Sequence, residues 1–266
     1  MSFQVSSLNS AQADAVNALD GPVLILAGAG TGKTRTVTCR IAHMVERKIA
    51  PENILAVTFT NKAANEMRER VGDMVSKAAG KEITVCTFHS LCVRILRTGI
   101  DRLGYKQNFT IYTGNDQTGL IKQIIVRKGG ADEKIEPGMV LSMISKAKNA
   151  GGDADSIDDP FVADVAKAYQ NELRAQNAVD FDDLLLLAER LLREYDDVRE
   201  ICRKRWTRIT VDEFQDTNGL QMRLLQQLVE KPYHVCVVGD DDQSIYGWRG
   251  AEVYTNPTMS SMRVRK

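Results

Sequence analysis

The sequence predicts an α/β protein with a parallel sheet, and three observations support this. Short apolar runs rich in β-branched residues recur, each with the length of a strand buried on both faces. Amphipathic helical patterns lie between these runs, as they do where helices connect parallel strands. In the middle of the chain the strand pattern nearly vanishes while the helical patterns continue. We therefore expect an α/β domain that is interrupted by an all-helical insertion.

The expected elements of the α/β domain alternate along the chain. The strands are predicted at Val23–Ala27, Ile54–Phe59, Ile83–Thr87, Ile209–Val211 and His234–Val238. The helices are predicted at Leu8–Leu19, Gly32–Arg47, Asn61–Lys77 and Leu220–Val229. Ligand sites of open parallel sheets lie at the carboxyl ends of the strands, so the residues after these runs are the first functional candidates.

The helical insertion is expected over residues 91–194. Its helical patterns cover Asp116–Arg127, Pro137–Lys148, Phe161–Gln176 and Phe181–Arg193, with Gly-containing loops between some of them. Residues 1–90 and 195–255 then form the α/β domain. Residues 256–266 show no periodic pattern and are expected to be an unpatterned tail.

Composition restricts the functional classes. The chain has 35 Lys+Arg and 35 Asp+Glu, so any nucleic-acid site must be local rather than a general basic surface. The five cysteines are odd in number and show no CxxC spacing, which favours reduced thiols over a metal site or disulfides. No secretory signal and no apolar run of membrane length are found, so we expect a cytoplasmic protein without a membrane partner.

A glycine-rich segment follows the first predicted strand and opens a predicted helix, which is the context of a phosphate-binding P-loop. Its expected nucleotide contacts are Ala27, Gly28, Ala29, Gly30, Thr31, Gly32, Lys33 and Thr34. Backbone N–H groups and the helix N-terminus would bind phosphate oxygens. Lys33 would neutralise the β- and γ-phosphates, and the Thr34 hydroxyl would ligate Mg²⁺. The alternative is a Gly-rich turn without a ligand.

Two carboxylates, Asp212 and Glu213, follow another predicted strand. We expect Asp212 to hold Mg²⁺, directly or through water, and Glu213 to orient and deprotonate the attacking water. An isolated acidic pair is usually a solvated turn, but a P-loop in the same sheet favours the catalytic interpretation. One helix before the P-loop, Gln12 carries an amide that can pair with an adenine edge, while Asn9 or Ser10 can cap that helix.

Candidate nucleic-acid contacts stand where two predicted strands end. Phe59, Thr60 and Asn61 lie at a strand-to-helix junction, where side chains can meet a sugar-phosphate backbone. His89 occupies the same position after the next strand, and a purely structural histidine is an equal alternative there.

A third candidate segment, Val237–Ala251, begins with an apolar run and a Gly turn. Gln243 offers a neutral amide that can sense a phosphate. Tyr246 and Trp248 offer aromatic faces on which bases can stack, and Arg249 adds a cation. This mixture of side chains favours a link between nucleotide hydrolysis and a nucleic-acid strand.

Together these segments resemble the superfamily 1 DNA helicases of the UvrD/Rep/PcrA group. The matching motifs are Leu8–Gln12, Ala27–Thr34, Thr58–Arg70, Thr87–Ser90, Val211–Asn218 and Val237–Ala251, and Asp180–Leu184 resembles a short block of that group's insertion. The resemblance implies a RecA-like first motor domain with a helical insertion. It also implies ATP and Mg²⁺ as cofactors and 3′→5′ movement on single-stranded DNA.

The resemblance implies further roles for single residues. Gln12 would read adenine, Arg35 would lie against the nucleotide, Gln243 would report the γ-phosphate and Arg249 would tie its loop toward the nucleotide. The residues that would line the single-strand path are Phe59, Asn61, His89, Tyr246 and Trp248.

The group's second RecA-like domain would follow residue 251, and these 266 residues leave no room for it. We therefore expect the chain by itself to bind ATP and Mg²⁺, to hydrolyse ATP slowly and not to unwind DNA. Two alternatives stay open. One is a non-motor module that binds ATP and single-stranded DNA and regulates a full-length helicase, and the other is a P-loop ATPase that acts on RNA or protein.

Overall fold

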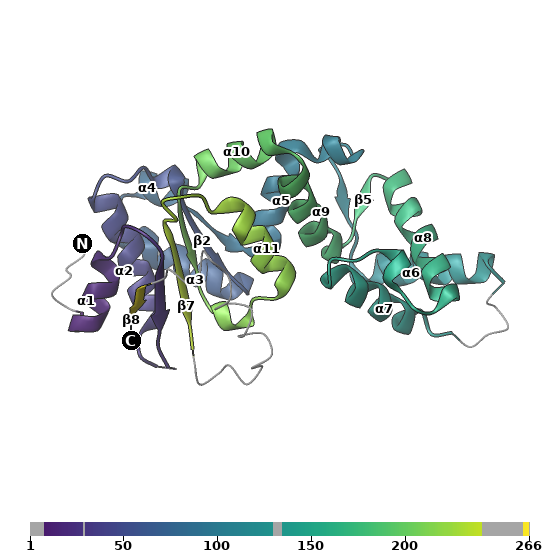
Figure 1. The fold of residues 1–266 in the computed structure, drawn as a ribbon, viewed down its shortest axis with the longest axis horizontal. Coiled ribbons are helices and arrows are strands. Elements are labelled where there is room, and N and C mark those ends of the chain that lie inside the picture. Colours follow the sequence, from purple (N-terminus) through teal and green to yellow (C-terminus); the bar gives the residue numbers. More distant parts are fainter. Residues whose placement is uncertain (1–7, 29, 130–134, 241–262, 266) are drawn as a thin grey trace. The chain divides into compact units, whose positions relative to one another are not determined.

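The computed structural model describes residues 8–28, 30–129, 135–240 and 263–265. It divides the chain into two compact units (Figure 1). One unit comprises Met1–Leu91 and Arg199–Lys266, and the other comprises Cys92–Val198. None of the helices in the described part of the chain combines the length and the apolarity needed to cross a membrane.

The first unit is built on a parallel sheet with the strand order β3-β2-β6-β7-β1-β8. The strands are β1 (Val23–Leu26), β2 (Ile54–Thr58), β3 (Thr84–Thr87), β6 (Arg208–Val211), β7 (Val235–Gly239) and β8 (Arg263–Arg265). All five neighbouring pairs are parallel. The predicted α/β class is therefore confirmed, and five strands lie where they were predicted. β8 lies in the stretch for which no element was predicted.

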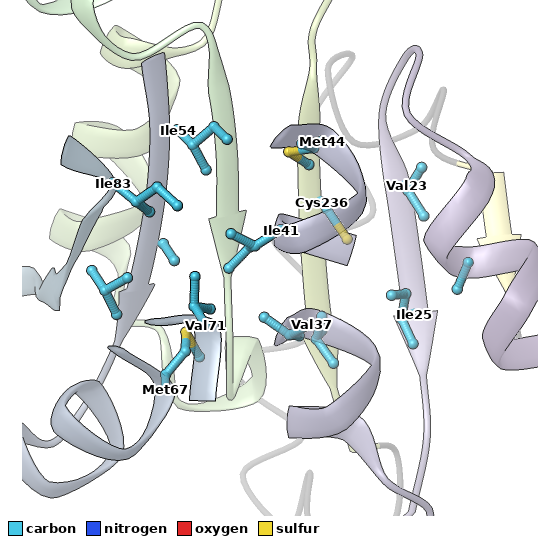
Figure 2. Close-up of a cluster of buried hydrophobic side chains, with 14 residues drawn as sticks. Val23, Ile25, Val37, Ile41, Met44, Ile54, Met67, Val71, Ile83 and Cys236 are labelled. Atoms are coloured by element: carbon cyan, nitrogen blue, oxygen red, sulfur yellow. The ribbon is translucent and has the colours of Figure 1, made fainter. Parts of the chain in front are cut away.

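The strands β1, β2, β3, β6 and β7 are buried on both faces along nearly their whole length, as their continuous apolar runs predict. One face packs against helices, and its core contains the residues labelled in Figure 2: Val23, Ile25, Val37, Ile41, Met44, Ile54, Met67, Val71, Ile83 and Cys236. Leu55 and Val57 alternate with the β2 residues of that face and are also fully buried. The sheet therefore has covered faces, and its strand ends are the places left for a site.

Several helices of this unit begin after a residue whose side chain caps them. The helices of the unit are α1 (Ser10–Asn17), α2 (Lys33–Glu46), α3 (Asn61–Met74), α4 (Lys77–Glu82) and α11 (Gly219–Leu228), with 3₁₀ turns η2 (Pro51–Asn53) and η5 (Phe214–Asp216). Asn9, Thr60 and Asn218 cap α1, α3 and α11 through side-chain oxygens. Two further helices, α5 (Phe88–Gly99) and α10 (Asp196–Arg205), continue from one unit into the other.

The second unit is helical, as predicted, with one exception. Its helices are α6 (Gly114–Arg127), α7 (Pro137–Asn149), α8 (Pro160–Ala175) and α9 (Phe181–Glu194), with 3₁₀ turns η3 (Ile100–Leu103) and η4 (Ala154–Ser156). The exception is a parallel pair of two-residue strands, β4 (Thr110–Ile111) and β5 (Ala178–Val179). Two residues are too few to show a period, so the expectation of an all-helical insertion was wrong at this point.

Candidate functional site

Three neighbouring strands end at the same edge of the sheet and carry the main candidates. β7 lies between β6 and β1, and all three run in parallel. Asp212 follows β6, Asp240 follows β7 and the glycine-rich loop follows β1. The backbone N–H of Ala27 donates to the carbonyl of Gly239 at 3.1 Å, which holds the beginning of the loop against the end of β7.

The loop after β1 has the backbone of an anion-binding turn. Gly30 and Gly32 adopt φ of 77° and 88°, which disfavours any residue with a side chain. Both the N–H and the hydroxyl of Thr31 donate to the carbonyl of Gly28, at 3.4 and 2.7 Å. α2 begins at Lys33 without a capping side chain and without an acidic residue in its first turn. Its N-terminus therefore suits a phosphate. Ala29 lies outside the described residues.

The ammonium group of Lys33 meets two carboxylates. Its Nζ lies 3.0 Å from Oδ2 of Asp240 and 3.7 Å from Oε2 of Glu213. The Lys33 side chain is 10% exposed and that of Asp240 only 1%, whereas Glu213 is 38% exposed. The lysine predicted to bind phosphate is thus held by an acid that the sequence analysis did not single out.

Asp212 and Glu213 are the predicted acidic pair. Asp212 has a raised pKa, and Glu213 has an uncommon backbone conformation. Burial of Asp212 and the adjacent charge of Glu213 raise the pKa of the Asp212 carboxyl to about 6, against the smaller opposing effects of the Glu213 N–H and Lys33. That N–H donates to Oδ1 of Asp212 at 3.1 Å. Glu213 has φ of 51°, which is uncommon for a residue other than glycine and frequent at functional sites.

Gln215 connects this pair to the end of β7. Its Nε2 donates to Oε2 of Glu213 at 2.6 Å, and its Oε1 accepts from the N–H of Asp240 at 3.2 Å. Sequence reasoning missed both Gln215 and Asp240. Asp240 lies two residues after the predicted strand His234–Val238, which indicates the right sheet edge, but Asp241 and Asp242 follow it and share that signal.

Gln12 lies beside the glycine-rich loop, but its amide already has partners in the protein. Its Nε2 donates to the carbonyl of Thr31 at 2.9 Å, and its Oε1 accepts from the N–H of Asn9 at 3.2 Å. Next to it is a cavity of about 320 Å³, which lies within the size range of small-molecule sites. The lining residues are Asn9, Ala11, Gln12, Ala15, Ile25, Leu26, Ala27, Gly28, Thr31, Lys33 and Thr36.

The oxygen donors at this edge of the sheet fit Mg²⁺ rather than a metal held by the protein alone. Thr34 is half-buried in the first turn of α2, and Asp212 is a buried carboxylate at the same sheet edge. Within the described ranges, no three His, Cys, Asp or Glu side chains converge on a point that could hold a metal ion. Mg²⁺ typically takes one or two protein oxygens together with phosphate oxygens and water, and this donor set meets that need.

The candidate nucleic-acid residues gather at the ends of β2 and β3. Thr58 and Thr87 are register partners, so the residues that follow them lie side by side. The rings of Phe59 and Phe88 are in edge-to-face contact, with centroids 5.4 Å apart. The four predicted residues are half-buried Phe59, exposed Thr60, exposed Asn61 and half-buried His89.

Thr60 and Arg35 each have a partner close by in the sequence. The Thr60 hydroxyl accepts from the N–H of Ala63 at 3.1 Å, so it caps α3. Arg35 is exposed on α2, where its guanidinium lies close to the Cys39 thiol; burial raises the pKa of that thiol against the effect of Arg35. The predictions for Gln243, Tyr246, Trp248 and Arg249 fall outside the described residues.

Comparison with known proteins covers nearly the whole chain. Residues 8–261 match the family described as UvrD/REP helicase N-terminal domain. The chain is 46% identical over 261 residues to the ATP-dependent DNA helicase PcrA of Bacillus subtilis, an alignment that covers 94% of this chain and 35% of that protein. PcrA of Staphylococcus epidermidis and PcrA of Staphylococcus aureus are each 44% identical to the chain. Each of these two alignments covers 95% of this chain and 36% of the relative. The chain therefore spans about a third of the length of these curated relatives.

Proposed function

This chain belongs to the UvrD/REP helicase family through its N-terminal domain, and from that premise we propose that it is the ATP-binding part of a 3′→5′ ATP-dependent DNA helicase. The observation that carries the proposal is the position of Lys33. Its ammonium group lies beside an uncapped helix N-terminus, within 3.7 Å of Glu213 and on the wall of a 320 Å³ cavity. A cation, a general base and an anion-binding turn are the parts that phosphoryl transfer to water requires.

In the proposed reaction the protein acts mainly by positioning and by charge. The turn from Ala27 to Gly32 and the first N–H groups of α2 bind the phosphates, and Lys33 neutralises the charge on the β- and γ-phosphates. Thr34 and Asp212 hold Mg²⁺, which when bound offsets phosphate charge.

Glu213 orients the attacking water and accepts its proton. Gln12 and the cavity beside it take the adenine ring, and Gln12 exchanges its present partners for the base edge. Arg35 lies near the nucleotide from the exposed side of α2.

DNA contact is proposed for Phe59, Thr60, Asn61 and His89 at the same edge of the sheet. A direct link to the ATP site supports this. The N–H of Asp212 donates to the carbonyl of Val57 at 2.9 Å, two residues before Phe59. The backbone of the proposed Mg²⁺ ligand is therefore one hydrogen bond away from the end of β2. Gln243, Tyr246, Trp248 and Arg249 keep the proposed roles of phosphate sensing, base stacking and coupling.

The proposed division of labour follows the predicted domains. Residues 1–90 and 195–255 form a RecA-like motor domain, and residues 91–194 form its insertion. The protein acts on DNA in the cytoplasm. Translocation in this family requires two motor domains that close around ATP, so a polypeptide of these 266 residues alone is expected to bind ATP, hydrolyse it slowly and leave duplex DNA intact.

The test compares the wild-type polypeptide with Lys33→Ala in ATP binding and in ATPase assays with single-stranded DNA, RNA or no polymer. Loss of Lys33 is expected to weaken binding and to lower hydrolysis on the order of 10²–10³-fold, because phosphate charge loses its protein cation. Lys81→Ala removes the same charge from an exposed turn of α4 and should leave both unchanged.

Three results would contradict the proposal. Equal ATP binding by wild type and Lys33→Ala would remove the P-loop from the mechanism. Stimulation by RNA alone would favour an RNA-dependent ATPase. Strand separation by the 266-residue polypeptide would show that the activity does not need a second motor domain.

A further inference from the structure

Asp240 is the strongest partner of Lys33 in the described structure. The Nζ–Oδ2 distance is 3.0 Å, against 3.7 Å to Glu213. The Asp240 side chain is 1% exposed, so its charge is screened little by solvent. A buried carboxylate at this distance neutralises much of the positive charge that the proposed function assigns to phosphate binding.

Hydrogen bonds on both sides hold the backbone that carries Asp240. The N–H of Asp240 donates to Oε1 of Gln215 at 3.2 Å, and the carbonyl of Gly239 accepts from the N–H of Ala27 at 3.1 Å. A Cβ on Gly239 would lie 3.3 Å from Oε1 of Gln215, so glycine at this position lets the amide approach closely. Asp240 is thus tied to the P-loop strand and to the 3₁₀ turn η5, which directly follows the proposed general base Glu213.

We propose that Asp240 is a resident counter-ion that competes with nucleotide phosphates for Lys33. The inference rests on the proposed function, since it takes Lys33 as the phosphate-binding cation. When phosphate arrives, Lys33 exchanges a carboxylate partner for phosphate oxygens, and Asp240 is left buried without that cation. The exchange lowers nucleotide affinity. It also gives Lys33 a partner to return to when phosphate leaves, which favours release of the product.

Asp240→Asn tests this competition, because the amide keeps the shape of the side chain and removes its charge. Binding of ATP, ADP and adenosine is measured with EDTA present, so that Mg²⁺ coordination does not contribute. ATP and ADP are expected to bind on the order of tenfold more tightly, equivalent to about 1.4 kcal/mol, while adenosine binds as before. A folded variant with unchanged or weaker ATP binding would overturn the inference.

Two controls separate charge competition from an indirect effect. In a Lys33→Ala background, Asp240→Asn should bring no further gain in ATP affinity, because the contested cation is gone. Asp164→Asn removes one negative charge from the exposed Lys128–Asp164 pair of the helical unit and should leave affinity unchanged. A gain of equal size in either control would contradict competition for Lys33.

A measurement on the wild-type protein covers the case in which Asp240→Asn does not fold. The carboxyl ¹³C resonance of Asp240 is expected to shift when ATP is added and to stay in place when adenosine is added. An unchanged resonance at saturating ATP would overturn the inference. ATP binding that does not depend on Lys33 would instead refute the proposed function itself. Lys33-dependent binding without a gain in Asp240→Asn refutes only the competition.

Discussion

Lys33 and Lys148 are two nearly buried lysines, one in each unit, and each meets two carboxylates. Lys33 is 10% exposed and Lys148 is 7% exposed. Lys148 lies 2.7 Å from both Asp180 and Asp183, each of which is 1% exposed. Lys33 has one close carboxylate at 3.0 Å and a second, 38% exposed, at 3.7 Å. Lys148 therefore has two close carboxylates, whereas Lys33 has only one.

Two further side chains donate hydrogen bonds to the carboxylates around Lys148. The hydroxyl of Tyr169 donates to Oδ2 of Asp180 at 3.0 Å, and Nε2 of Gln170 donates to Oδ2 of Asp183 at 3.3 Å. Burial acts to lower the pKa of Lys148, but the charges of Asp183 and Asp180 outweigh it and raise that pKa. The adjoining cavity has a volume of about 130 Å³, against about 320 Å³ beside Lys33.

The difference separates a structural cluster from the proposed binding site. The ion pairs of Lys148 join α7 to the start of α9, and the hydrogen bond from Tyr169 to Asp180 adds α8, so the cluster holds three helices of the insertion together. Lys33 faces a larger cavity and has a weaker second partner, so a ligand with negative charge can complete its coordination. A buried lysine alone does not indicate a phosphate site. A buried lysine that has only one close carboxylate and borders a cavity does indicate one.

The largest effect on stability is expected from Lys148→Met. This change leaves Asp180 and Asp183 buried without their cation, and breaking a buried pair in this way costs about 3–5 kcal/mol. Chemical denaturation followed in the helical unit measures the loss. ATP affinity should be unchanged under conditions in which the variant remains folded, because Lys148 takes no part in the nucleotide site.

Two further variants test the comparison. Lys167→Met removes an exposed partner of Asp155 and should change stability by less than about 1 kcal/mol. Lys33→Met should cost less stability than Lys148→Met, because Glu213 is partly solvated. An equal or larger loss in Lys33→Met would break the distinction between the two lysines.

Asp212→Asn is expected to raise the free energy of unfolding, by less than Lys148→Met lowers it. The folded-state pKa of Asp212 is raised from 3.8 to about 6, so between these values the folded protein binds more protons than the unfolded chain. The unfolding free energy of the wild type therefore falls as pH rises through this window. At 1.36 kcal/mol per pKa unit, ionised Asp212 destabilises the fold by about 3 kcal/mol above pH 6.

Asp212→Asn should therefore be more stable than wild type at pH 7–8, and the difference should disappear below about pH 4. Thermal or chemical unfolding without nucleotide and Mg²⁺ measures it across pH. Asp20→Asn, whose side chain is 91% exposed, serves as the control. A gain that does not depend on pH would attribute the effect to packing instead of charge. Stability given up at a carboxylate of the proposed site is typical of residues kept for function.

Sequence patterns predicted the sheet because each central strand is buried on both faces and reads as a continuous apolar run, as Ile54–Thr58 does. They did not predict β4 and β5, whose two residues each show no period. The helix α10 was also missed. Most of its residues are charged, and only Val198 and Cys202 are buried in its core-facing stripe. Short or mostly charged elements take their structure from distant contacts.

At the candidate site, the residues that were proposed from the sequence belong to local motifs. The glycine-rich loop and the Asp212–Glu213 pair are each contiguous and follow apolar runs. The contact between Lys33 and Asp240 joins residues 207 positions apart, and nothing local distinguishes Asp240 from Asp241 and Asp242. Gln215 carries no charge and has no periodic position. The order of the strands in the sheet brings Asp240 to Lys33 and Gln215 to Asp240.

The smallest effect is expected from Gln215→Met, which removes the amide that holds Glu213 at 2.6 Å. A freed Glu213 spends less time in position for the attacking water. We expect kcat for ATP hydrolysis to fall on the order of tenfold, less than the 10²–10⁴-fold contribution of a general base, with KM nearly unchanged. Gln170→Met removes the corresponding amide from Asp183 beside Lys148 and should leave kcat unchanged. Similar losses of kcat in both variants would show that Gln215 supports the fold. A higher KM at constant kcat in Gln215→Met would show that Gln215 acts through Asp240 and does not position Glu213.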